Sequence, residues 1–180
     1  MKPAAALSSI EAKPEISIDV RDAIWGDLNF DVTALCRAAA TEAIAPEEDI
    51  SGEVEISVVL ADDAFVRELN RTWRHMDMPT NVLAFPCSGG DESARIGAER
   101  LLGDVIVAFQ TTRREAGELN LPLEHHLAHL IIHGVLHLLG YDHIDDGDAA
   151  IMEKLEIEAL ARLGMENPYE KMPTTYETGR

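Results

Sequence analysis

The sequence has little of what would indicate a disulfide scaffold or a membrane protein. It contains only two cysteines, Cys36 and Cys87, whose separation is not that of paired metal ligands. No apolar run approaches the roughly 20 residues that a membrane span needs. The first residues lack the pattern of a signal peptide, which predicts a cytoplasmic protein in which disulfides are rare. We therefore expect both cysteines to be free thiols, small residues of the core or its edge.

Basic residues are also scarce, which bears on any binding of nucleic acid. The chain carries 15 Lys and Arg against 33 Asp and Glu, a formal net charge of -18. Such a charge repels a polyanion at long range, so nucleic-acid binding would need a local basic cluster. Arg67, Arg71 and Arg74 form one, because positions i, i+4 and i+7 share a helix face. For Arg67 and Arg71, phosphate contact and a solvated face of ion pairs are equally good interpretations.

The length of 180 residues and a hydrophobic content of 46% suit one globular domain. Apolar alternation or continuous apolar runs predict four strands, near residues 16–20, 54–58, 81–85 and 101–109. Helical spacing and capping residues predict five helices, at 31–45, 62–73, 111–118, 122–139 and 148–163, with a loop at 88–97. We find no internal repeat or linker. The sequence therefore predicts a single α+β domain over residues 15–164, after a loose lead-in at 1–14 and before a frayed C-terminal tail at 165–180.

Histidines are concentrated in the helix predicted at 122–139. His126, His129, His133 and His137 fall within one narrow stripe of that helix, at about 100° per residue. The opposite side carries apolar residues that would face the core. Buried imidazole nitrogens need partners, and a metal ion can satisfy several at once. The alternative is a buried polar cluster without metal.

The spacing His133-Gly-Val-Leu-His137, followed by Gly140 and His143, predicts a metal site. Histidines at i and i+4 can bind one ion together. Gly140 permits the left-handed conformation that ends a helix, so the chain can turn back and offer His143 as a third ligand. Three protein ligands leave a position for water, which is typical of catalytic zinc. We therefore predict one Zn²⁺ per chain, which would lower the pKa of a bound water toward ~7.

The same spacing, His-x-x-x-His-x-x-Gly-x-x-His, occurs in metzincin proteases. Those enzymes place a glutamate directly after the first histidine as general base, whereas this chain has Gly134 there. Glycine accepts no proton, so the sequence argues against a peptidase.

Other residues near these motifs have more than one interpretation. His129 lies one turn before His133 and can either hydrogen-bond within the metal centre or contact substrate. Asp142 can accept a hydrogen bond from a ligating imidazole, act as general base, or cap a turn. Trp73 is either a core residue, which we favour, or a platform for a nucleobase.

Three segments together carry a resemblance to a known family. The stretch HGVLHLLGYDH at 133–143 resembles the signature of the YbeY family of bacterial endoribonucleases. The stretches LNRTWR at 69–74 and PTNVLAFP at 79–86 are similar to the same family, and LGDVIV at 102–107 is a less specific match. The likeness extends over roughly residues 54–160.

The resemblance implies a zinc-dependent, single-strand-specific endoribonuclease that matures the 3′ end of small-subunit 16S rRNA and acts in ribosome quality control. It also implies a small mixed β-sheet packed with helices around a metal cleft. His133, His137 and His143 match the family's metal ligands, and Arg74 matches its functional arginine. The implied partners are RNA, small-subunit ribosomal proteins and a ribosome-assembly GTPase. The competing functions are a non-enzymatic ribosome-assembly factor braced by zinc, and a metallohydrolase of another substrate.

Overall fold

The computed structural model describes residues 14–46, 53–87, 95–96 and 99–170. Its strands are β1 (Glu15–Val20), β2 (Glu53–Ala61), β3 (Val82–Pro86), β4 (Arg95–Ile96) and β5 (Glu99–Ala108). Its helices are α1 (Val32–Ile44), α2 (Asp63–Arg74), α3 (Phe109–Glu118), α4 (Leu123–Leu139) and α5 (Asp146–Arg162), with 3₁₀ turns at Ala23–Asp27 and Pro168–Glu170. The predicted α+β class, with four main strands and five helices, is confirmed. Strand β4 falls within the loop predicted at 88–97; the rest of that loop and most of the lead-in at 1–14 lie outside the described residues.

Aspartates determine where three of the helices begin. The side chains of Asp31 and Asp62 accept hydrogen bonds from amides in the first turns of α1 and α2. Asp145 does the same for α5. Because Asp145 is the cap, α5 begins at Asp146, two residues before the predicted start. Such caps satisfy amides that have no partner within the helix.

The sheet is mixed and has the order β1-β2-β5-β3, with the short β4 also paired to β5. β1, β2 and β5 run parallel, and β3 pairs antiparallel with β5 along the opposite edge from β1. In register, Val58 of β2 lies beside Val105 of β5, which in turn lies beside Ala84 of β3. β3 is therefore an edge strand in the described part of the sheet, and α4 packs against it.

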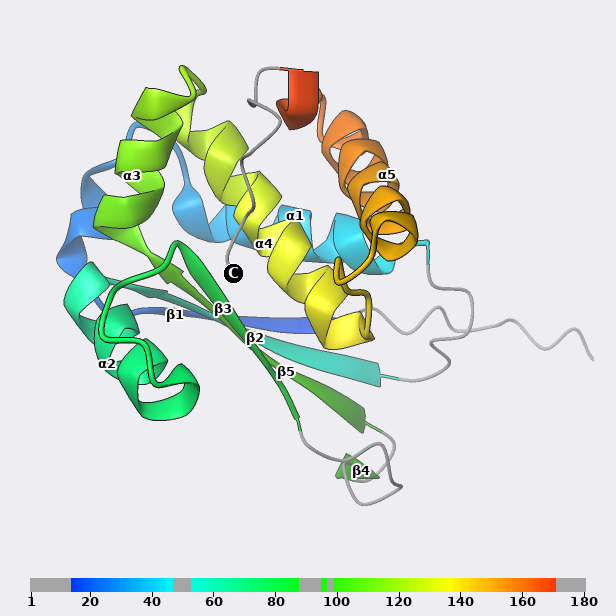
Figure 1. The fold of residues 1–180 in the computed structure, drawn as a ribbon, viewed down its shortest axis with the longest axis horizontal. Coiled ribbons are helices and arrows are strands. Elements are labelled where there is room, and N and C mark those ends of the chain that lie inside the picture. Colours follow the sequence, from blue (N-terminus) through cyan, green and yellow to red (C-terminus); the bar gives the residue numbers. More distant parts are fainter. Residues whose placement is uncertain (1–13, 47–52, 88–94, 97–98, 171–180) are drawn as a thin grey trace, which may run out of the picture.

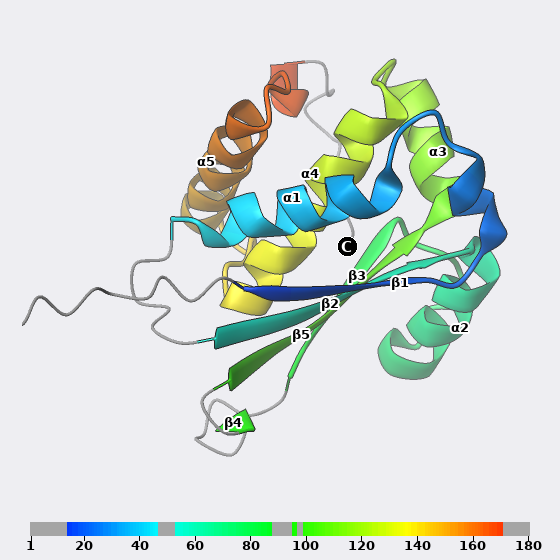
Figure 2. The same ribbon diagram turned by 180° about the vertical axis from the view of Figure 1, so that it is seen from behind.

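Helices cover both faces of the sheet. α1, α3, α4 and α5 lie on one side of it and α2 on the other (Figures 1 and 2). The larger core is built from α1, α4 and α5 against one sheet face, and the smaller one from α2 against the other. This explains why the second halves of β2 and β5, residues 58–61 and 105–108, are continuously apolar, since a strand covered on both faces does not alternate. In the described part of the chain, no helix is long and apolar enough to cross a membrane.

The sequence assigns residues 165–180 to a frayed tail, but the described part of this stretch packs against the domain. Pro168 is buried in the 3₁₀ turn after α5. The hydroxyl of Tyr169 donates a hydrogen bond to the buried carboxylate of Glu156 in α5. No periodic pattern indicates such a contact, because it is made by a single side chain.

Gly134 lets α4 pack closely against the sheet. A Cβ at this position would lie 2.6 Å from Cγ1 of Val105, a fully buried side chain of β5. The residue that separates this motif from that of the metzincins therefore has a packing role, and its Cα–Cβ direction leads into the core.

We expect Gly134→Ala to destabilise the fold. Overpacking a core typically costs about 1–3 kcal/mol, which exceeds the roughly 0.5–1 kcal/mol that alanine gains over glycine in a helix. The matched control is Gly117→Ala in α3, where nothing lies within 4 Å of an added Cβ. Urea unfolding should therefore give opposite signs for the two variants. If Gly134→Ala has the same free energy of unfolding as the parent, α4 can shift away from β5 by the width of a methyl group without loss of stability.

Candidate metal centre

The end of α4 brings three histidines together. His133 and His137 lie in its last two turns, and the helix ends at Gly140 in the left-handed conformation, with φ 97°. The chain then reverses, with the amide of Tyr141 bonded to the carbonyl of Leu136 at 3.0 Å. This turn returns His143 to the helix end. One nitrogen from each of the three histidines lies within 4.8 Å of the others.

The hydrogen bonds of two of these rings determine their tautomers. His133 Nδ1 lies 2.7 Å from a carboxylate oxygen of Glu156, and His137 Nδ1 lies 3.0 Å from the carbonyl oxygen of Tyr141. Because both partners only accept, both Nδ1 atoms carry hydrogen, and in the neutral form of each ring Nε2 carries a lone pair. The two Nε2 atoms nevertheless lie 3.0 Å apart. Two lone pairs at this distance repel unless a cation lies against both, so the donor set fits a metal ion.

A proton on His137 does not supply that cation at neutral pH. Burial, with added repulsion from His133 and His143, lowers the pKa of His137 to about 4. The ring is therefore neutral under physiological conditions, the state in which imidazole binds metals. Neutral imidazoles suit zinc and other late transition metals.

Glu156 of α5 is a component of the centre that the sequence did not predict. It is 1% exposed, and its second oxygen lies 2.8 Å from Nε2 of His129. Burial alone would raise the pKa of Glu156, but the His129 and His133 rings outweigh it and hold the pKa well below its usual range. One signal was available: Glu156 occupies the core-facing side of α5, where Met152, Ala159 and Leu160 are the other buried residues.

The contacts of His129 favour one of its two interpretations. The ring is fully buried and its Nε2 lies 2.8 Å from a carboxylate oxygen of Glu156, which matches hydrogen bonding within the candidate centre better than contact with substrate. His126, next on the stripe, belongs to a separate pair: its Nε2 lies 3.0 Å from Glu115 of α3, which also accepts from Asn81. The histidine stripe therefore serves the buried carboxylate of Glu156, the partly buried carboxylate of Glu115 and the predicted metal site.

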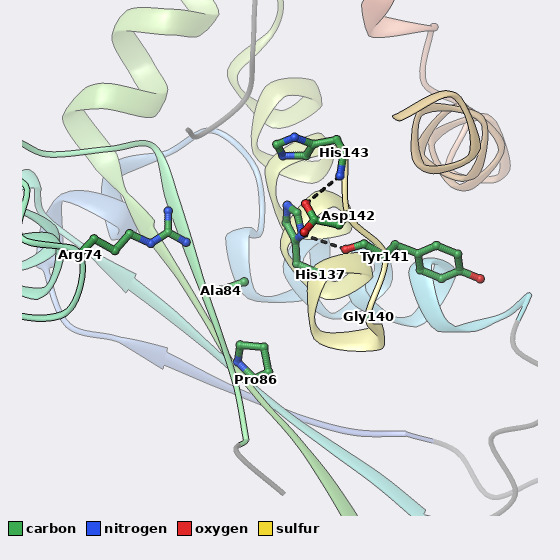
Figure 3. A pocket seen from close by; sticks show the side chains of 8 residues that line it. All are labelled: Arg74, Ala84, Pro86, His137, Gly140, Tyr141, Asp142 and His143. Carbon is green, nitrogen blue, oxygen red and sulfur yellow. Dashed lines mark hydrogen bonds between the residues drawn. The ribbon is translucent and has the colours of Figure 1, made fainter. Parts of the chain in front are cut away.

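Two of the three histidines, His137 and His143, line an open pocket of ≈ 430 Å³. The residues that line it come from α2, β3 and the end of α4: Arg74, Ala84, Pro86, His137, Gly140, Tyr141, Asp142 and His143. Arg74, the last residue of α2, extends past Ala84 of β3 toward the histidines (Figure 3). Among the described residues, none forms an ion pair with Arg74. An exposed guanidinium is thus directed into the same pocket as two of the candidate metal ligands, His137 and His143.

Arg67 and Arg71, on the same helix as Arg74, do not line this pocket. Arg67 binds Asp77 through two nitrogens, at 2.7 and 2.9 Å, and Arg71 binds Glu68 in the same way. All four side chains are more than half exposed. The geometry matches the interpretation as a solvated face of ion pairs.

Asp142 lines the pocket but does not hydrogen-bond a ligating ring. Its Oδ1 accepts the backbone amide of His143 at 2.7 Å (Figure 3), which is a turn-capping contact. The carboxylate is exposed to solvent.

The prediction that Trp73 belongs to the core was wrong. Its side chain is 68% exposed, and it meets Phe85 of β3 edge-on with ring centroids 6.3 Å apart. The last turn of α2 contributes no buried residue, since the buried positions of this helix are Val66 and Asn70. An exposed tryptophan therefore directly precedes the arginine that enters the pocket.

The sequence is similar to those of known proteins along most of its length. The family model described as "Endoribonuclease YbeY" matches residues 27–164, a wider range than the sequence motifs had indicated. The endoribonuclease YbeY of Paramagnetospirillum magneticum is 50% identical over 157 residues, which cover 86% of this chain and 95% of that protein. That of Methylocella silvestris is 45% identical, covering 93% of this chain and 92% of its own length.

A solved structure has a similar fold. The solution structure of the Thermotoga maritima protein TM1509 aligns with a TM-score of 0.53 at 24% identity, covering 90% of this chain and 99% of the other. At this level of identity the likeness concerns the fold alone.

Proposed function

The chain belongs to the YbeY family of endoribonucleases, and from this premise we propose that it cleaves single-stranded RNA with a zinc ion held by His133, His137 and His143. One observation carries the proposal. Three imidazole nitrogens lie within 4.8 Å of one another, and two of these histidines, His137 and His143, line a pocket that Arg74 also lines. Metal ligands and a phosphate-binding side chain are what phosphodiester hydrolysis requires at one site.

The residues of the pocket have distinct roles in this proposal. A zinc ion, when bound, lowers the pKa of a water and withdraws electrons from a phosphoryl oxygen. Arg74 binds non-bridging phosphate oxygens, for which its planar fork is suited. Asp142 is the one carboxylate among the described lining residues, and only its Oδ1 is used by the turn. We propose that the other oxygen of Asp142 accepts the proton of the attacking water.

We propose the 3′ end of small-subunit rRNA as the substrate, with roles in rRNA maturation and ribosome quality control in the cytoplasm. The net charge of -18 disfavours encounter with free RNA. Protein partners that deliver the substrate would remove this penalty, and the family resemblance implies small-subunit ribosomal proteins and an assembly GTPase. Arg74 supplies the attraction needed once RNA is at the pocket.

The direct test is cleavage of a single-stranded RNA that contains the 3′ end of small-subunit rRNA. We expect the zinc-loaded protein to cleave it, and the same protein to lose activity in chelator and regain it when zinc is restored. A double-stranded version should resist. A protein that binds zinc but cleaves no RNA, even with small ribosomal subunits as substrate, would favour the non-enzymatic assembly factor. Chelator-sensitive hydrolysis of unstructured peptides would instead favour the metallohydrolase of another substrate.

We further expect Trp73 to stack on a base of the bound RNA. The chain has two tryptophans, and Trp25 is 1% exposed, so Trp73 is the one that added RNA can reach. Base stacking on an aromatic ring is worth roughly 1–3 kcal/mol. In the presence of chelator, which prevents cleavage, titration with a short single-stranded RNA should therefore quench the tryptophan fluorescence, and the quenching should saturate. In Trp73→Phe, the remaining fluorescence of Trp25 should not respond.

Kinetics provide a second measurement of the same contact. Trp73→Ala should raise KM for RNA with a smaller effect on kcat, since stacking holds substrate and transition state alike. Ile151→Ala, which removes an exposed apolar side chain from α5, is the matched control. Equal KM values for Trp73→Ala and the parent would contradict the stacking role and leave the cleavage proposal intact.

A further inference from the structure

A buried network lies behind the candidate metal ligands, on the same stripe of α4 and one turn earlier along the helix. Glu156 is at its centre and is bonded to three donors: His133 Nδ1 at 2.7 Å, His129 Nε2 at 2.8 Å, and the hydroxyl of Tyr169. The donors come from α4 and from the 3₁₀ turn after α5. A carboxylate 1% exposed is costly to bury unless it is fully bonded, and this one is.

The network acts on the metal centre through one atom. Since the carboxylate only accepts, it keeps hydrogen on His133 Nδ1 and thereby leaves the lone pair on Nε2, the nitrogen that faces His137. The 2.7 Å bond also fixes the rotation of the ring. A charged acceptor on one imidazole nitrogen makes the other a stronger donor to a cation.

We propose that Glu156 is a positioning residue of the metal centre: it holds His133 in the tautomer and orientation that bind the ion, and Tyr169 and His129 hold Glu156. The inference rests on the proposed metal site. It assigns a function to α5 and the 3₁₀ turn at Pro168–Glu170, which contribute no metal ligand.

Tyr169 is suited to act as a permanent donor to Glu156. Burial, together with the neighbouring carboxylate, raises the pKa of the Tyr169 hydroxyl well above its usual range. The hydroxyl therefore keeps its proton at any physiological pH. Its bond occupies Oε2, which leaves Oε1 for His133.

The chain contains a matched control for the purely structural alternative, in which Glu156 only satisfies buried histidines. Glu115 of α3 lies 3.0 Å from Nε2 of His126. His126 is on α4, in the same stripe as His129 and His133, but it is not a candidate ligand. Loss of Glu115 should affect folding in a similar way without affecting the metal. A difference between the two glutamates in zinc affinity therefore measures positioning.

The experiment compares Glu156→Gln, Glu156→Asp, Tyr169→Phe and Glu115→Gln with the full-length parent. Zinc affinity is measured by competition with a chromophoric chelator, and stability of the metal-free protein by urea unfolding. We expect Glu156→Gln to lose about 10- to 100-fold in zinc affinity, the range for outer partners of ligating histidines. Glu156→Asp, which keeps the charge, should recover part of it, and Tyr169→Phe should lose less. Glu115→Gln should bind zinc as the parent does.

A spectroscopic measurement reports the tautomer directly. In ¹⁵N-labelled parent protein, long-range correlations should place hydrogen on Nδ1 of His133. In Glu156→Gln we expect a mixture, because the amide can present either its oxygen or its NH₂ to that ring. If Glu156→Gln does not fold, Glu156→Asp and Tyr169→Phe carry the test.

The outcomes separate the two proposals. Zinc affinity unchanged in the folded variants of Glu156 and Tyr169, or lowered equally in Glu115→Gln, would overturn the positioning role. A parent protein that binds no zinc would instead overturn the metal site itself.

Discussion

Arg74→Ala is expected to slow cleavage of single-stranded RNA by roughly two to three powers of ten, the effect of removing a preorganised donor from a developing charge. The phosphodiester transition state concentrates negative charge on non-bridging oxygens. The carboxylate of Glu156, bonded to His133, offsets about one unit of the charge that a divalent ion brings. The guanidinium of Arg74, exposed and unpaired among the described residues, then supplies a larger share of the stabilisation.

Cleavage rate, zinc content and unfolding of Arg74→Ala should be measured together. Zinc content and stability should match the parent, because no ligand or buried contact is removed. Arg74→Lys should restore activity only in part, since an ammonium keeps the charge but loses the two-pronged geometry. Arg67→Ala removes an arginine already bound to Asp77 and should cause a smaller, salt-dependent loss. If Arg74→Ala cleaves RNA as fast as the parent, Arg74 has no catalytic role.

His137→Ala is expected to lose most of the bound zinc and, with it, RNA cleavage. The change removes one of three ligands, so affinity should fall by more than the ~10- to 100-fold that loss of an outer partner costs. Zinc analysis after dialysis gives the occupancy directly. The matched control is His125→Ala, which removes a histidine of the same helix that lies outside the cluster. Full occupancy in a triple variant of His133, His137 and His143 would rule out the metal site.

Thermal unfolding provides an independent measurement of the same site. A ligand at about 100 times its Kd stabilises the folded state by about 2.7 kcal/mol. Chelation should therefore lower the Tm of the parent and of His125→Ala, but not that of His137→Ala. A Tm of the parent that is the same with zinc and with chelator would contradict tight binding to the folded protein.

The sequence by itself determined which three histidines cluster at the end of α4, and most of the secondary structure. His133 and His137 are one helical turn apart, and Gly140 lets the chain reverse within three residues, so the ligand cluster depends on local geometry that spacing encodes. Helix and strand types likewise follow from apolar periods and capping aspartates. The resemblance to the family also singles out Arg74, by its position in a motif, but does not indicate which residues Arg74 faces.

Tertiary structure decided what surrounds those ligands. Arg74 shares a pocket with His137 and His143 because α2 ends beside the edge strand β3, and Glu156 meets His133 because α5 packs against α4. Trp73 has an apolar character that suits burial, yet it lies in the last turn of α2, where the helix has no buried residue, so it is exposed. Gly134 is one residue of a motif in the sequence, but in the fold it is the place where α4 meets Val105. Each of these contacts joins elements distant along the chain, and local periodicity records the face of a residue without specifying its partner.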